Sequence, residues 1–258
     1  MSQIASMAEH PHIYEYVSQE KPLVVYFPGF NGMMTGKNAV KTQKTALMAG
    51  CSYLAFNPIA LKEGDAPNVY HDFGLAVDNI KKFLSASEIE QQVKDNAVFV
   101  FNSWSARPAL EAIRDLGVEP KNVIGIGATL RAHEVFNAGM QAYIAGHFPG
   151  VEVKREVYES GSSVVVPYPP YSKDLIDINR SFMEAGRTHN LVEKSIRVSG
   201  DVFLFRGRQD EYVSFKNVEE LDNIFNFKGG DNPVIEVDAN HDSYDSVPLI
   251  QEMLKSVL

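Results

Sequence analysis

The sequence contains a single cysteine, Cys51, so an internal disulfide is excluded. It lies in the apolar segment AGCSYLAF, as is typical of a buried and unreactive thiol in a reducing compartment. No stretch approaches the ~18 consecutive apolar residues that a membrane-spanning helix needs. The N-terminal residues 1–16 also lack the basic and apolar regions of a secretory signal. We therefore expect a cytoplasmic protein without a membrane span.

Positive charge is also scarce. The chain has 24 lysines and arginines against 33 aspartates and glutamates, which gives a formal net charge of −9. Such a surface repels polyanions, so nucleic acid is not an expected partner. Hydrophobic residues make up 45% of the chain and charged residues 22%, which excludes disordered, collagen-like and fibrous classes. The 258 residues suit one large globular domain.

Short apolar runs alternate with amphipathic segments along most of the chain. The runs are nearly continuous in hydrophobicity, as in strands that are buried on both faces of a parallel sheet. We predict strands at 23–27, 52–56, 97–101, 122–127, 201–207 and 233–237, with helices at 38–49, 71–86, 106–116, 215–225 and 245–257. The segment 12–18 indicates an additional edge strand. This alternation predicts an α/β fold with a doubly wound, mostly parallel sheet.

The alternation is interrupted between residues 131 and 198. This segment contains GHFPG, ESGSS and VVVPYPPYSKD and has no clean period. A stretch of this length between two strands is typical of a lid over a site rather than of a separate domain. We expect one domain, 1–258, with a cap or lid insertion at 131–198.

The segment NSWSARPAL follows a predicted strand directly and opens a helix. Such a turn raises a serine above the sheet edge, beside the N–H groups of a helix N-terminus. We predict Ser105 as the nucleophile, because the small residue Ser103 at −2 lets the turn close. Ser103 is the competing candidate and ranks lower, since it would place the bulky Phe101 at −2 and make the turn one residue too early. Alternatively, Ser105 only caps the helix.

A serine hydroxyl is a poor nucleophile unless a base removes its proton and an acid orients that base. Asp210 follows the predicted strand 201–207, and His241 follows the predicted strand 233–237. The carboxyl ends of parallel strands meet at one crevice. Ser105, Asp210 and His241 also occur in the chain order of the α/β-hydrolase triad. The base has one candidate, whereas three carboxylates near Asp210 or His241 are alternative candidates for the acid: Glu211, Asp238 and Asp242.

An acyl-transfer site also needs N–H donors for the oxygen that becomes negative. The first predicted central strand ends in LVVYFPGFNG, and the turn after it stands where an early loop normally supplies one donor. The predicted donors are the backbone N–H groups of Phe30 and Ala106. Alternatively, PGFNG is only a glycine-rich turn.

No cofactor is expected. The glycines of GIGATL lack the third glycine of a dinucleotide fingerprint, because Leu130 stands there. The histidines show no spacing of a metal site. Trp104, Tyr168 and Tyr171 are aromatic residues that suit an apolar acyl pocket under the lid, although aromatic residues more commonly only pack.

Together, PLVVYFPGFNG, NSWSARPALEA, NRSFMEAGRTHNLV, FLFRGRQDEYV and ANHDS resemble the α/β-hydrolase superfamily. Within it, the chain is similar to the small-lid group of palmitoyl-protein thioesterases and acyl-glucuronide esterases. The S-x-S-A-R elbow also resembles that of bacterial luminescence acyl-transferases. The similarity runs from Pro22 to the end but is strong only in these segments. It implies the α/β-hydrolase fold and these roles: Ser105 nucleophile, Asp210 acid, His241 base, Phe30 and Ala106 oxyanion donors.

The expected activity is hydrolysis of a carboxylic ester or thioester through an acyl-enzyme. Arg107 replaces the small residue found in most of the superfamily, which indicates either a wider helix–strand spacing or a cation facing the site. The expected substrate pocket comprises Trp104, Arg107 and Tyr171. Two alternatives remain: transfer of the acyl group to an acceptor other than water, and a non-catalytic binding protein on the same fold. The partner is expected to be a small-molecule or acyl substrate. Acyl chain length, leaving group and oligomeric state stay open.

Overall fold

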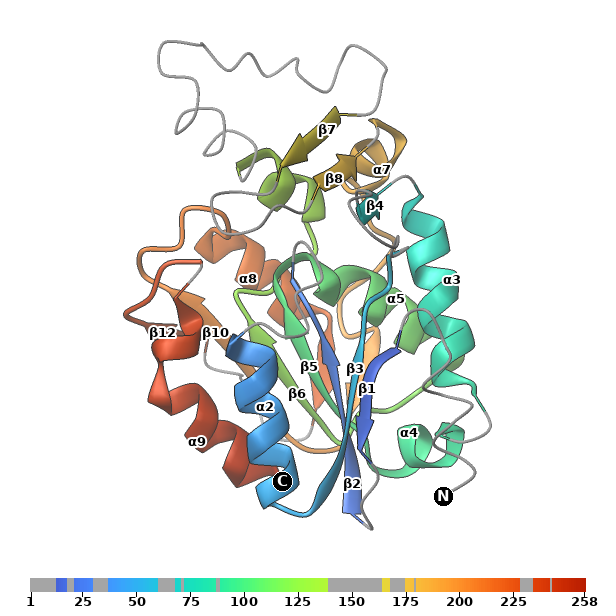
Figure 1. The fold of residues 1–258 in the computed structure, drawn as a ribbon, viewed down its shortest axis with the longest axis vertical. Helices are drawn as coiled ribbons and strands as arrows, with labels where there is room; N and C mark the ends of the chain where they lie inside the picture. Colours follow the sequence, from blue (N-terminus) through green and yellow to red (C-terminus); the bar gives the residue numbers. More distant parts are fainter. Residues whose placement is uncertain are drawn as a thin grey trace.

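A seven-stranded sheet forms the centre of the protein (Figure 1), in the order β1-β3-β2-β5-β6-β10-β12. The computed structural model describes residues 13–17, 21–29, 37–59, 68–70, 72–86, 89–138, 164–167, 175–178, 180–227, 234–241 and 243–258. The strands of the sheet are β1 (Ile13–Val17), β2 (Lys21–Phe27), β3 (Cys51–Phe56), β5 (Val98–Asn102), β6 (Asn122–Ile126), β10 (Val202–Gly207) and β12 (Val234–Val237). Only β1 runs antiparallel to its neighbour in this sheet, so the predicted doubly wound sheet and its edge strand are confirmed.

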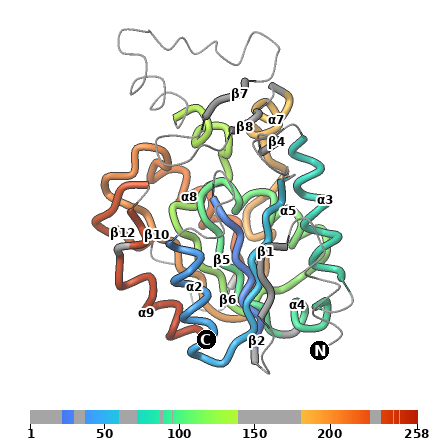
Figure 2. The backbone as a smooth tube through the Cα atoms, viewed as in Figure 1, coloured from blue at the N-terminus to red at the C-terminus, as the bar shows by residue number. Residues whose placement is uncertain are grey.

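Helices cover both faces of the sheet. They are α2 (Lys37–Met48), α3 (Phe73–Leu84), α4 (Glu90–Asn96), α5 (Ala106–Leu116), α8 (Phe215–Asn223) and α9 (Pro248–Val257). Because successive side chains of a strand point to opposite faces, the residues of β2 divide between two cores. Leu23, Val25 and Phe27 pack with α3, α4, α5 and α8, whereas Val24 and Tyr26 pack with α2 and α9. The backbone trace shows α2 and α9 side by side on their face (Figure 2).

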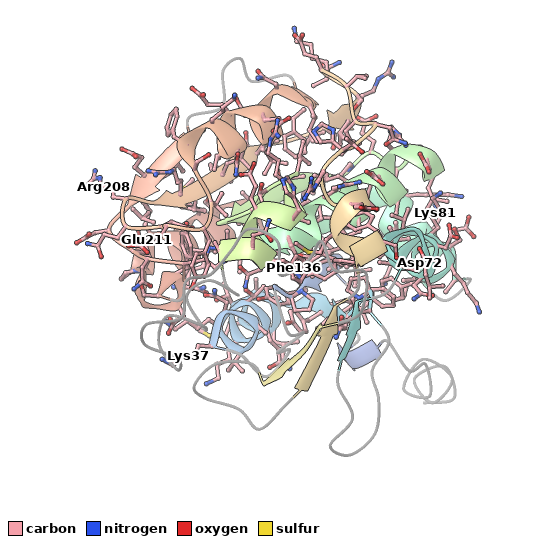
Figure 3. All side chains as sticks on the ribbon, turned by 90° about the horizontal axis from the view of Figure 1, so that it is seen from above. Lys37, Asp72, Lys81, Phe136, Arg208 and Glu211 are labelled. Atoms are coloured by element: carbon pink, nitrogen blue, oxygen red, sulfur yellow. The ribbon has the colours of Figure 1, made fainter. Side chains whose placement is uncertain are left out.

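The register of the parallel strands brings their carboxyl ends to one edge. The last paired residues are Phe27 with Phe101 and Gly207 with Val237. The view onto this edge (Figure 3) shows Phe136 near its centre, with Lys37, Asp72, Arg208 and Glu211 around it. The loops that follow β2, β5, β10 and β12 carry the predicted site residues. The parallel sheet therefore gathers at one edge segments that lie far apart in the sequence.

The described residues between β6 and β10 form a helix at 132–138, β7 (Val164–Pro167), β8 (Leu175–Ile178), α7 (Arg180–Ala185) and β9 (Ile196–Val198). β8 pairs with β7 and with β4 (Asn68–Tyr70) in a small separate sheet, and β9 pairs with β11 (Phe225–Phe227). Figure 1 shows β7, β8 and α7 beyond the edge at which the parallel strands end. Residues 139–163, 168–174 and 179 of the expected cap lie outside the described residues.

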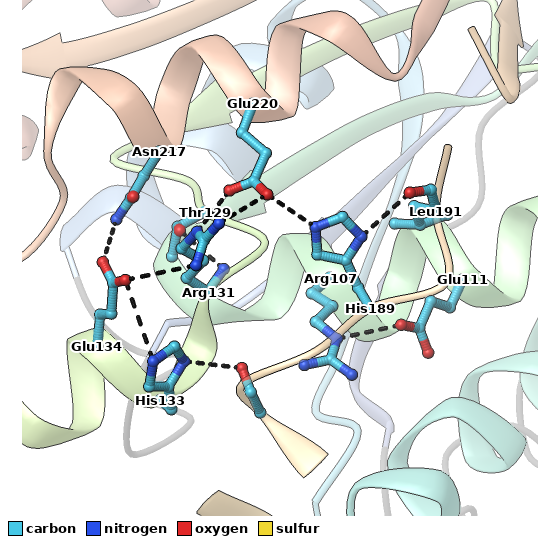
Figure 4. A network of polar contacts seen from close by, with 11 residues as sticks. Arg107, Glu111, Thr129, Arg131, His133, Glu134, His189, Leu191, Asn217 and Glu220 are labelled. Carbon is cyan, nitrogen blue, oxygen red and sulfur yellow. Dashed lines mark hydrogen bonds and ion pairs between the residues drawn. The ribbon is translucent and has the colours of Figure 1, made fainter. Parts of the chain in front are cut away.

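A polar network links both ends of the segment between β6 and β10 to helix α8 (Figure 4). Arg131 Nε and Nη2 donate to the two carboxylate oxygens of Glu220, at 2.6 and 3.1 Å. His189 Nε2 lies 3.1 Å from the same carboxylate, and Asn217 donates to Glu134 at 2.7 Å. A two-pronged arginine–carboxylate pair fixes both distance and orientation. The base of the connection is therefore anchored to the main domain.

None of the helices in the described part of the chain is long and apolar enough to cross a membrane.

Candidate active site

Ser103 is the serine that lies against His241. Strand β5 ends at Asn102, and Ser103 has a backbone φ of 59° in the left-handed region. A non-glycine residue rarely adopts this conformation, and such strain is typical of the sharp turn that presents a nucleophile. A short 3-10 turn then leads into α5 at Ala106. The Ser103 Oγ atom lies 3.0 Å from His241 Nε2.

Ser105 occupies a different environment, and the predicted pairing of Ser105 with His241 is wrong. Its side chain is fully buried. The hydroxyl shares its proton between the carbonyl oxygens of Phe27 and Asn102, at 3.1 and 2.9 Å, and it accepts the N–H of Asn102 at 3.3 Å. The Ser105 hydroxyl therefore donates its proton to backbone carbonyl oxygens.

Both arguments that ranked Ser103 below Ser105 fail for physical reasons. The bulky side chain of Phe101 does not obstruct the turn, because its ring is buried in the core and stacks on Phe27 with ring centres 5.6 Å apart. The turn also does not come too early, since β5 continues to Asn102 and the chain changes direction at the next residue.

The predicted partnership of Asp210 and His241 is present in the structure. His241 Nδ1 lies 2.9 Å from Asp210 Oδ2. The Asp210 side chain is fully buried, while His241 is 12% exposed. The other carboxylate oxygen accepts the backbone N–H groups of Tyr212 and Val213, both at 2.9 Å. With a proton on Nδ1, the histidine presents the lone pair of Nε2 to the Ser103 hydroxyl.

The surroundings of Asp210 keep it ionised. Burial raises the pKa of this carboxyl, but the hydrogen bond and charge of His241, the N–H of Val213 and the hydroxyl of Tyr244 outweigh burial and hold the pKa below its ordinary value. An ionised carboxylate at this position can orient the imidazole and stabilise its protonated form.

Tyr244 is a site residue that the sequence analysis missed. Its hydroxyl donates to Asp210 Oδ2 at 2.9 Å and accepts the N–H of Gly207 at 2.6 Å. Burial and the charge of Asp210 raise the pKa of Tyr244 well above its ordinary value, so the hydroxyl remains a neutral donor. At Gly127, where φ is 51°, a Cβ would lie 2.8 Å from the Tyr244 ring. A glycine directly after the end of strand β6 was the sequence signal of this close approach.

The structure changes the expected oxyanion donors in part. The N–H of Ala106 donates to the carbonyl oxygens of Ser103 and Trp104 within the turn, so this group is engaged, contrary to prediction. If Ser103 is the nucleophile, the residue after it, whose backbone N–H would be the oxyanion donor, is Trp104. Phe30 lies outside the described residues. The neighbouring Gly29 approaches closely, since a Cβ there would lie 3.4 Å from the Cβ of Ser103.

Trp104, one of the predicted pocket residues, packs in a cluster of aromatic rings. Trp104 is buried, and its ring centre lies 5.7 Å from that of Phe136 and 5.8 Å from that of Phe182. This apolar cluster joins the elbow to the helix 132–138 and to α7. Tyr168 and Tyr171 lie outside the described residues.

Arg107 is buried against helix α3. Its Nε donates to Glu111 at 3.1 Å, and its guanidinium lies 4.1 Å from the ring centre of Phe73 (Figure 4 shows the ion pair). Burial lowers the pKa of Arg107, and the Glu111 carboxylate opposes this effect. No group of three metal-ligating side chains that could hold an ion occurs among the described residues.

Comparison with known proteins finds similarity in structure and not in sequence. No family model matches the chain, and neither does any curated protein sequence. A putative hydrolase from Agrobacterium vitis S4 has a TM-score of 0.63 and 16% identity, over 94% of this chain and 91% of that chain. Mouse alpha/beta hydrolase domain-containing protein 10 has a TM-score of 0.60 and 16% identity, over 93% and 90%. A monoacylglycerol lipase from Paleococcus ferrophilus has a TM-score of 0.55 and 15% identity, over 95% and 99%. The chain therefore has the α/β-hydrolase fold.

Proposed function

We propose that this protein is a serine hydrolase that cleaves carboxylic esters or thioesters through an acyl-enzyme. The observation that carries the proposal is one chain of contacts: Ser103 Oγ to His241 Nε2 at 3.0 Å, and His241 Nδ1 to Asp210 Oδ2 at 2.9 Å. Nucleophile, base and orienting acid in such contact are the components of acyl transfer. The similarity in fold to a monoacylglycerol lipase supports the same class of reaction.

In the proposed reaction, Ser103 Oγ attacks the acyl carbonyl carbon while His241 Nε2 takes the hydroxyl proton. The imidazolium is stabilised by the ionised Asp210. The negative oxygen of the tetrahedral intermediate is held by backbone N–H groups, of which Trp104 supplies one and the turn after β2, at Phe30, supplies the other. The imidazolium then protonates the departing alcohol or thiol, and water releases the acid by the same steps in reverse order.

We place the acyl group against the buried aromatic cluster of Trp104, Phe136 and Phe182, under a cap formed by 131–198. The cluster is apolar and begins at the residue that follows Ser103. Tyr171 and Arg107 are proposed to border the same pocket. A long acyl chain would fit the resemblance to palmitoyl-protein thioesterases, and transfer to an acceptor other than water would fit the resemblance to luminescence acyl-transferases.

A panel of p-nitrophenyl esters and matched thioesters, from acetyl to palmitoyl, tests this placement. We expect kcat/KM to rise with acyl length by up to about fourfold per methylene, because each buried CH₂ contributes ~0.8 kcal/mol. Product analysis with added alcohols or amines measures acyl transfer in the same experiment. A maximum at acetyl with steady decline thereafter would contradict the aromatic acyl pocket, and the absence of turnover on the whole panel would contradict the hydrolase.

The Tyr244→Phe variant is expected to lower kcat by about tenfold, because the Asp210 carboxylate loses one of its hydrogen bonds. It should also lower the free energy of unfolding by about 1–3 kcal/mol, since the buried N–H of Gly207 loses its acceptor. Steady-state kinetics and urea unfolding measure the two effects. Tyr53→Phe is the matched control, as the Tyr53 hydroxyl is also buried but donates to Ala39 O in helix α2. Equal kcat values for Tyr244→Phe and Tyr53→Phe would contradict a role at Asp210.

A further inference from the structure

The end of strand β2 is joined to the elbow by side-chain hydrogen bonds. The ladder between β2 and β5 ends at the pair Phe27 and Phe101. Two residues later the chain turns away at Ser103, and regular pairing stops. Beyond that point the Ser105 hydroxyl reaches back to the Phe27 carbonyl at 3.1 Å. A side chain thus continues the connection between the two strands where the backbone ladder ends.

A second bond reinforces the same connection. The Asn102 side-chain N–H₂ donates to the Tyr26 hydroxyl at 3.2 Å. Burial raises the pKa of Tyr26 to about 12, while the bond from Asn102 acts in the opposite direction, so this hydroxyl is neutral. The last two residues of β2 are therefore both bonded to the turn that carries Ser103.

The segment held in this way leads directly into the turn after β2. Phe27 precedes Pro28 and Gly29, and a Cβ at Gly29 would lie 3.4 Å from the Ser103 Cβ. The spacing between β2 and the elbow therefore sets how closely this turn approaches the nucleophile. In an acyl-transfer site, a backbone N–H of this turn must lie about 3 Å from the developing oxyanion.

We propose that Ser105 is a positioning residue of the oxyanion pocket: its buried hydroxyl holds the turn after β2 against the elbow, so that the turn's N–H donor and Ser103 act on the same carbonyl group. The proposal rests on the proposed function. It explains why a hydroxyl stands two residues after the nucleophile, where the hydrolase motif usually has glycine. A displacement of about 1 Å in such a donor can cost on the order of 100-fold in rate.

The Ser105→Ala enzyme tests the proposal. We expect kcat to fall about 10- to 100-fold with KM nearly unchanged, because the misplaced donor acts on the transition state. The affinity for a trifluoromethyl ketone, which forms a tetrahedral adduct with the serine, should fall by a similar factor. The affinity for the product carboxylic acid should stay within about twofold, since the acyl pocket is not altered.

Thr42→Val is the matched control. Thr42 is also buried, and its hydroxyl donates to a backbone carbonyl, that of Asn38, in helix α2. This variant should keep the kinetics and inhibitor affinity of the wild type while it reports the general effect of removing a buried hydroxyl. Ser105→Cys keeps a side chain of similar shape with a weaker donor, and it carries the same comparison if Ser105→Ala does not fold.

Wild-type kcat and trifluoromethyl ketone affinity in Ser105→Ala would overturn the proposal, as would equal losses of ketone and product affinity. These outcomes leave the proposed function intact if Ser103→Ala is inactive. If Ser103→Ala retains full activity while Ser105→Ala has none, the assignment of Ser103 as nucleophile fails as well. The two failures are therefore distinguishable.

Discussion

The Ser103→Ala protein is expected to lose ester hydrolysis by a factor on the order of 10⁵ or more, because no hydroxyl then faces His241. Its folding should be almost unchanged. Among the described residues, the Ser103 hydroxyl bonds His241, and alanine tolerates the left-handed backbone about as poorly as serine does. Initial rates with a p-nitrophenyl ester and circular dichroism measure activity and fold.

Ser103→Gly provides the matching control. Glycine adopts a φ of 59° without the steric cost, so this variant should be inactive but more stable than Ser103→Ala by about 1 kcal/mol. A folded Ser103→Ala enzyme with more than a tenth of the wild-type activity would contradict the proposed mechanism.

The Asp210→Asn enzyme is expected to lose about 10⁴-fold in kcat, the second largest effect. The neutral amide cannot stabilise the imidazolium, and its N–H₂ group competes with the proton on His241 Nδ1. Asp238→Asn is the matched control, because Asp238 is a neighbouring carboxylate that bonds the Gln209 side chain at 2.8 Å. It should retain wild-type kcat. A large loss in Asp238→Asn with little loss in Asp210→Asn would reverse the assignment of the acid.

The lowered pKa of Asp210 predicts how the stability of the wild type and of Asp210→Asn depends on pH. The pKa of Asp210 is lower in the folded protein than its ordinary value, so its ionised form stabilises the fold above the unfolded pKa of about 3.9. This contribution is lost as pH falls through the folded pKa. The free energy of unfolding should therefore decline more steeply with acid in the wild type than in Asp210→Asn, as urea titrations between about pH 6 and pH 3 would show. Parallel declines in the two proteins would contradict a lowered pKa of Asp210 in the folded protein.

Most of the sheet could be predicted because buried parallel strands carry continuous apolar runs. The predicted helix 106–116 coincides with α5, and the other four predicted helices differ from the observed ones by no more than three residues at either end. Asp210 and His241 could also be located, because each follows a strand and parallel strands end together. Short elements such as β4, β7 and β9 carry too few residues for a period to be recognised.

The predicted nucleophile, Ser105, lies two residues after the serine that contacts His241, and the reason is the S-x-S pattern itself. In S-x-S each serine has a small residue two positions away, so the local pattern fits both. The choice depends on where β5 ends and on which residue takes a positive φ, and element boundaries are the weakest part of a sequence prediction. Tyr244 was missed because its contacts with Asp210 and Gly207 join residues over 30 positions apart, which no local pattern records.

Labelling with a fluorophosphonate tests the central claim most directly. The reagent reacts with a serine that an adjacent base activates, and trypsin leaves Ser103 and Ser105 in one peptide. Fragment ions that break the chain on either side of Trp104 then locate the adduct. We predict that the label is on Ser103 and that labelling requires His241. An adduct on Ser105, or no adduct in the folded wild-type protein, would contradict the proposed site.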